Sequence, residues 1–202
     1  MPLPVAATIN CAVATAAGAL RLAGPIKDKT VLITGMGLLG LNAVAMCHNI
    51  GAAEIIAVDT DASRLETALR FGAHRSINTG KEYRQEELPG IDIALDMSGA
   101  PDAMEYGLEA LAVGGTAVWV GAVFHTREIR VNAERMIRNV LTLKGLHNYN
   151  YEDLQTAVNF MTENGHKYPF DEIVAQEFTL ENAEKAFEYA LAHKPLRVGL
   201  RM

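Results

Sequence analysis

The sequence has little cysteine and no continuous basic run. Only two of its 202 residues are cysteine, Cys11 and Cys47, which is too few for a disulfide framework and favours a reducing cytoplasm. The net charge is −6, and the longest cationic cluster, residues 127–138, is interrupted by acidic and apolar residues. These features argue against nucleic acid as a partner.

Long apolar segments are also scarce. No window reaches the roughly 18 apolar residues of a membrane span, so we expect no membrane association. The alanine-rich opening, residues 4–19, lacks the positively charged start and the cleavage site of a signal peptide. Half of the residues are nonetheless hydrophobic, which is enough for the core of one large α/β domain.

A glycine motif is the most informative feature that is present. Gly35, Gly37 and Gly40 form the pattern G-x-G-x-x-G, which follows a β-branched run at residues 31–34 and opens a helix-like segment at residues 38–50. Such glycines supply a tight turn, an approach path for a pyrophosphate and close packing of helix on strand. The first amides of the helix then face the anion. The motif predicts a dinucleotide site.

Asp59 indicates which dinucleotide is bound. It ends a second apolar run, about 20 residues after the motif, where a carboxylate accepts hydrogen bonds from both ribose hydroxyls and repels a 2′-phosphate. The sequence therefore favours NAD over NADP. Arg64 either reaches the same ribose or is a solvated side chain of the next helix. Asp61 is interpreted as the N-cap of that helix.

Strands and helices alternate along most of the chain. We predict helices at residues 4–23, 38–50, 63–71, 101–113 and 132–139, and strands at residues 30–34, 54–59, 75–78, 91–97, 116–120 and 141–146. The charged segment 81–88 is expected to be a short surface crossover, and Pro89-Gly90 to open strand four. This alternation predicts a doubly wound α/β parallel sheet, the Rossmann fold, with strand order 3-2-1-4-5-6. Its ligand site lies at the carboxyl ends of the strands, in the loops after Thr34, Asp59, Met97 and Val120.

The character of the sequence changes after Leu146. A helix at residues 151–163, a strand at 173–178, a helix at 181–192 and a strand at 196–201 do not extend the repeat. We therefore divide the chain into a dinucleotide-binding domain with a linking helix, residues 1–146, and a tail, residues 147–202.

Several separated motifs resemble those of the medium-chain zinc-dependent alcohol dehydrogenases, over residues 10 to 202. The glycine motif, and Asp59 with a basic residue five positions later, are similar to the NAD fingerprint of that family. The segments 10–18, 120–122, 144–147 and 196–200 resemble the zinc-ligand segment, the turn beside the nicotinamide, the end of strand six and the closing strand. The resemblance implies a cofactor site made of Thr15, Gly35, Gly37, Leu38, Leu39, Gly40, Asp59, Arg64, Ser98, Val120, Gly121, Ala122, Leu146, His147 and Arg197.

The resemblance also implies what this chain does not supply. In the family a GroES-like catalytic domain precedes this region and completes the zinc site, so Cys11 is one ligand of a partial site and zinc is bound only if that domain is supplied. The tail is expected to pack on that domain. His147 is a candidate proton relay, and Arg197 is a candidate pyrophosphate ligand or a charge at a strand edge. Residues 10–15 and 80–90 are most similar to dehydrogenases associated with phosphonate catabolism.

Three functions remain open from the sequence. The first is the cofactor-binding part of an NAD-dependent alcohol dehydrogenase, which is inactive alone, acts on an alcohol or aldehyde as part of the full enzyme, and forms a homodimer through strand six. The second is a stand-alone NAD-binding module. The third is a zinc-free oxidoreductase of the quinone-reductase kind, against which Asp59, Cys11 and the tail argue.

Overall fold

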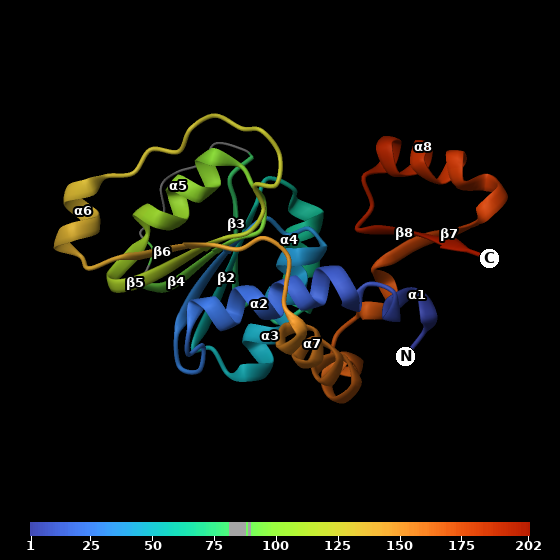
Figure 1. Cartoon of the computed structure of the whole chain (residues 1–202), viewed down its shortest axis with the longest axis horizontal. Helices are drawn as coiled ribbons and strands as arrows, with labels where there is room; N and C mark the ends of the chain where they lie inside the picture. Colours follow the sequence, from blue (N-terminus) through green and yellow to red (C-terminus); the bar gives the residue numbers. More distant parts are fainter. Residues whose placement is uncertain (81–87, 89) are drawn as a thin grey trace.

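The main sheet contains six parallel strands. The structure, a computed structural model, describes residues 1–80, 88 and 90–202. The strand order is β3-β2-β1-β4-β5-β6, which confirms the predicted α/β fold (Figure 1). The predicted crossover at 81–88, apart from Leu88, and the predicted role of Pro89 lie outside the described residues. The strands are β1 (Thr30–Thr34), β2 (Glu54–Asp59), β3 (Arg75–Asn78), β4 (Ile91–Asp96), β5 (Leu111–Trp119) and β6 (Thr142–Gly145).

Both faces of this sheet are covered because successive side chains of each strand point to opposite sides. In β1, Val31 and Ile33 enter the larger core cluster, whereas Leu32 enters the smaller one on the other face. Apolar runs without strict alternation are typical of such buried parallel strands. This burial explains why the strands were recognisable in the sequence.

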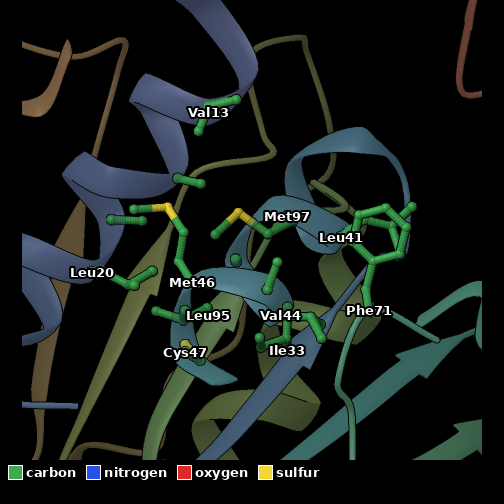
Figure 2. Packing of buried hydrophobic residues seen from close by; sticks show 14 of the residues in the cluster. Val13, Leu20, Ile33, Leu41, Val44, Met46, Cys47, Phe71, Leu95 and Met97 are labelled. Atoms are coloured by element: carbon green, nitrogen blue, oxygen red, sulfur yellow. The ribbon is translucent and has the colours of Figure 1, made fainter. Parts of the chain in front are cut away.

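The helices form a layer on each face of the sheet. The larger core cluster is built by α2 (Ala14–Ala23), α3 (Leu38–Ile50), α4 (Ala62–Arg70) and α7 (Tyr151–Asn164). Figure 2 shows Leu20 of α2, Val44 of α3 and Ile33 of β1 within this cluster. The opposite face is covered by α5 (Pro101–Glu109) and α6 (Ala133–Arg138) (Figure 1).

The N-terminal helix is less regular than the sequence predicts. The single helix expected at residues 4–23 consists of α1 (Leu3–Ala6), a π-helical turn (Ile9–Val13) and α2. The Thr8 hydroxyl donates to the Val5 carbonyl oxygen at 2.8 Å, a local bond that competes with regular helix. Within the described residues, the 21 residues Leu3–Ala23 are long and apolar enough to cross a membrane, which corrects our expectation that no such segment exists. Two thirds of the apolar window is buried inside the protein, as in a core helix of a soluble protein.

The tail has two parts that pack differently. Residues up to Ile173, including α7 and the two 3₁₀ turns Gly165–Lys167 and Phe170–Glu172, add Phe160, Tyr168 and Phe170 to the larger core cluster. We call the second part, residues 174–201, the C-terminal lobe. It comprises β7 (Val174–Thr179), a 3₁₀ turn (Leu180–Asn182), α8 (Ala183–His193) and β8 (Arg197–Arg201). In the lobe, β7 and β8 form a second, two-stranded parallel sheet set apart from the main one (Figure 1).

Several predicted boundaries were wrong. Helix α5 ends at Glu109 rather than residue 113, and β5 begins at Leu111 rather than residue 116. The reason is a bulge: Leu111 pairs with Ile91, and the register shifts before the next pair. Gly114, with φ +79°, lies inside this irregular strand instead of ending the helix.

Candidate functional site

The glycine turn joins β1 to α3. Gly35 adopts φ +88°, its N–H donates to the Val58 carbonyl oxygen at 2.8 Å, and a Cβ added there would lie 2.7 Å from the Ser98 backbone nitrogen. A Cβ at Gly40 would overlap the Gly35 carbonyl oxygen, whereas a Cβ at Gly37 would meet no atom within 4 Å. Gly35 and Gly40 therefore allow close packing, and Gly37 leaves open space at the start of α3. A pyrophosphate fits this arrangement because helix-start amides attract anions.

Asp59, at the end of β2, contacts the glycine turn directly. Its Oδ2 accepts a hydrogen bond from the Met36 N–H at 2.6 Å, and its Oδ1 accepts one from the Asp61 N–H at 2.9 Å. A carboxylate has about four acceptor positions, so two remain for the hydroxyls of a ribose. The half-buried Asp59 side chain is thus held beside the turn with unused acceptor capacity.

The start of α4 lies next to this carboxylate. Asp61 is the N-cap of α4, as predicted, and its Oδ1 accepts from the Ser63 N–H at 2.8 Å. Hydrogen bonds from the Ser63 hydroxyl and N–H lower the pKa of Asp61. Arg64 donates to the Lys194 carbonyl oxygen at 3.3 Å. This hydrogen bond links Arg64, in the first turn of α4, to the C-terminal lobe.

Asp96, at the end of β4, was not recognised from the sequence. Its side chain is 3% exposed, and its Oδ1 accepts hydrogen bonds from the Thr34 hydroxyl at 2.9 Å and the Ser98 hydroxyl at 2.6 Å. Its Oδ2 accepts from the Gly99 N–H at 3.0 Å. An aspartate at the end of an apolar strand, followed by Met-Ser-Gly, is the signal that could have indicated it.

The remaining predicted residues of the nicotinamide side follow β5 and β6 directly or, for Thr15, lie on α2. Gly121 packs so closely on Gly99 that a Cβ on either would overlap the backbone of the other. The Leu146 N–H donates to the Trp119 carbonyl oxygen at 2.9 Å, which continues the sheet beyond β6. Within the same group, Thr15 and Val120 are buried, Gly121 and Leu146 are half-buried, and Ala122 and His147 are exposed.

A second group missed from the sequence fixes the loop after β5. Arg127 pairs with Asp102 and with Glu105, the latter at 2.6 Å, and Glu105 also accepts from the Arg130 N–H at 2.8 Å. The hydrogen bond from Arg127 lowers the pKa of Glu105 to about 2. These contacts tie the loop to α5.

Cys11 and Arg197 lie on elements other than those that form the glycine turn and the strand ends around it. Both line a cavity of about 980 Å³ between the N-terminal segment and the C-terminal lobe. No group of three or more His, Cys, Asp or Glu side chains within the described ranges could hold a metal ion, and catalytic zinc needs three protein ligands. The described part of this chain therefore does not fit a zinc ion by itself. Arg197 belongs to β8 of the second sheet, while the glycine turn belongs to the main sheet.

The fold and the glycine turn together define a dinucleotide-binding domain of the Rossmann type. The model of the zinc-binding dehydrogenase family matches residues 39–163, which is more than half of the chain. The chain therefore belongs to the zinc-binding dehydrogenase family.

Individual relatives support this assignment. An alcohol dehydrogenase of Malus domestica is 33% identical to this chain, and the match covers 100% of this chain and 55% of the relative. An L-threonine 3-dehydrogenase of Shewanella baltica is 27% identical over 81% of this chain and 48% of the relative. Among solved structures, an alcohol dehydrogenase of Thermotoga maritima superimposes with a TM-score of 0.91 at 26% identity, over 99% of this chain and 57% of that chain. The chain thus spans about half the length of these relatives. The resemblance to phosphonate-associated dehydrogenases stays a prediction.

Proposed function

We propose that this chain is the cofactor-binding part of an NAD-dependent, zinc-type alcohol dehydrogenase. The observation that carries the proposal is the Asp59 carboxylate, fixed beside the glycine turn by its 2.6 Å hydrogen bond from the Met36 N–H. This carboxylate has acceptors left for a ribose and repels a 2′-phosphate. The bound dinucleotide would supply hydride acceptance from an alcohol or hydride donation to an aldehyde.

The residues of this chain would bind and orient the cofactor. The open surface at Gly37 and the first amides of α3 receive the pyrophosphate. Ser98 and Gly121, on the neighbouring strand ends, border the nicotinamide side. Because the described residues do not form a zinc site, activation of the substrate hydroxyl requires groups beyond them, and we expect the chain alone to be inactive. We also propose a cytoplasmic homodimer.

Parallel titrations with NADH and NADPH test the cofactor assignment. We expect NADH to bind at least about tenfold more tightly, which corresponds to about 1.4 kcal/mol. Asp59→Asn should narrow this difference in affinity, mainly by weakening the binding of NADH, because the side chain loses its charge. The amide oxygen still accepts from the Met36 N–H. Asp61→Asn is the matched control, since asparagine is an equally good N-cap, and it should keep the preference.

Two outcomes would contradict the proposal. Equal affinity of the wild-type chain for both dinucleotides would refute the role of Asp59. Binding of NADH together with turnover of an alcohol or a quinone by the chain alone would refute the proposed inactivity and would favour a zinc-free oxidoreductase. Binding without turnover is expected both for the proposed enzyme part and for a stand-alone module, and restoration of turnover by an added catalytic domain distinguishes these two.

A further inference from the structure

The buried carboxylate of Asp96 lies at the point where the strand order reverses, between β1 and β4. Four donors reach it, and all are neutral: the Thr34 hydroxyl, the Ser98 N–H at 3.2 Å, the Ser98 hydroxyl and the Gly99 N–H. A buried carboxylate is costly unless such donors surround it. The segments that supply these donors must therefore keep their positions around it.

The backbone of Asp96 extends this junction to a third strand. Its carbonyl oxygen accepts from the Val120 N–H at 3.0 Å and from the Gly121 N–H at 3.2 Å, at the end of β5. One residue thus holds the ends of β1, β4 and β5 together. In doubly wound sheets these strand ends border the ligand crevice.

Close packing transmits the position of the Ser98 turn to both neighbouring loops. A Cβ on Gly35 would lie 2.7 Å from the Ser98 backbone nitrogen, and a Cβ on Gly121 would lie at the same distance from it. Gly99 adopts φ +73° against Gly121. Because these contacts leave no room for even a methyl group, a shift of Ser98 displaces the loops on both sides.

We propose that Asp96 is a positioning residue that sets the part of the crevice receiving the nicotinamide half of the dinucleotide. The inference rests on the proposed function. The adenosine half depends on Asp59 and the start of α4, which Asp96 reaches only indirectly, through the glycine turn whose Met36 N–H donates to Asp59. Loss of the Asp96 carboxylate should therefore affect the two halves of the cofactor unequally.

The test compares NADH with AMP, which carries only the adenosine end, as ligands of the wild-type and Asp96→Asn chains. In the variant the amide nitrogen faces an N–H or hydroxyl donor, so at least one buried donor loses its acceptor. We expect NADH to bind on the order of tenfold more weakly, with a clearly smaller loss of AMP affinity. Asp92→Asn is the matched control: Asp92 lies on the same strand but at its other end, where it accepts from the Thr30 N–H and Lys29. This control should keep both affinities.

Thr34→Val, which removes one donor and leaves the carboxylate, provides a milder variant if Asp96→Asn does not fold. It should likewise weaken NADH more than AMP. Unchanged NADH affinity, or equal losses for NADH and AMP, in the folded variant would overturn the inference while leaving the proposed function intact. Failure of the wild-type chain to bind NADH would instead overturn the proposed function and this inference with it.

Discussion

The ion pair between Arg21 of α2 and Asp153 of α7 gives a stability prediction that can be worked out from the structure. Arg21 Nε and Nη2 donate to the two carboxylate oxygens of Asp153 at 2.7 and 2.9 Å. Asp153 is only 2% exposed and also accepts from the Asn150 N–H in the capping box of α7. Asp153→Asn removes the charge but keeps an oxygen for the Asn150 N–H.

The expected loss follows from the exposure of the two partners. Hydrogen bonds to charged groups contribute about 1.5–3 kcal/mol, but the Arg21 side chain is 45% exposed, so water screens the pair. We expect Asp153→Asn to lower the free energy of unfolding by about 1–2 kcal/mol. For a chain of this length that corresponds to a Tm decrease of roughly 2–8 °C, measurable by circular dichroism.

The effect should depend on pH. The Arg21 hydrogen bond lowers the pKa of Asp153, so the stabilisation is complete above the unfolded-state pKa of about 3.9 and disappears as the pH falls through the folded-state pKa. Glu172→Gln is the control, because Glu172 forms the same kind of pair with Arg70 but both side chains are more than half exposed. Equal Tm losses for the two variants, or an undiminished loss for Asp153→Asn at about pH 3, would refute this reasoning.

Three further predictions concern the turn, the cysteines and association. Gly37→Ala should leave the Tm near that of the wild type but weaken NADH binding, whereas Gly40→Ala should lower the Tm because its Cβ overlaps a backbone carbonyl. A larger Tm decrease for Gly37→Ala than for Gly40→Ala would contradict this packing. Burial raises the pKa of the Cys47 thiol to about 12, so a thiol reagent at about pH 8 should modify only the exposed Cys11 in the folded chain. A rapid reaction of both thiols would argue against the buried position of Cys47. Metal analysis should find less than one zinc per chain. The edge strand β6 should pair with the same strand of a second copy in a homodimer. Val140 is exposed and lies two residues before β6, so Val140→Asp should reduce association in light scattering. A wild-type chain that stays monomeric at high concentration would contradict the dimer.

Local patterns predicted the first half of the fold well. The segments β1, α3 and β2 have the predicted bounds because apolar runs, the glycine motif and Asp59 act within a short stretch of sequence. The start of β5 was missed because Gly114-Gly115 is typical of a helix end, and only the pairing of Leu111 with Ile91 shows that the strand begins earlier. That pairing joins residues that are distant in the sequence.

The candidate site divides in the same way. Asp59 was recognisable because its spacing from the glycine motif is fixed by one strand–helix–strand unit. Ser98 and Gly99, which donate to Asp96, are its neighbours in the sequence, but Thr34 is 62 residues away and reaches Asp96 only when β4 lies beside β1. The position of Arg197 likewise depends on how the lobe returns to the N-terminal segment, which no local pattern specifies.

The hydrogen bond from Arg64 to the Lys194 carbonyl oxygen links two equilibria. Arg64 lies in the first turn of α4, beside the proposed ribose site, whereas Lys194 belongs to the C-terminal lobe. A cofactor that draws the Arg64 guanidinium to its ribose or phosphate would free this carbonyl and loosen the lobe. Since coupling free energies are reciprocal, any other contact that holds the lobe in place would keep the Lys194 carbonyl beside Arg64 and weaken cofactor binding by the same factor.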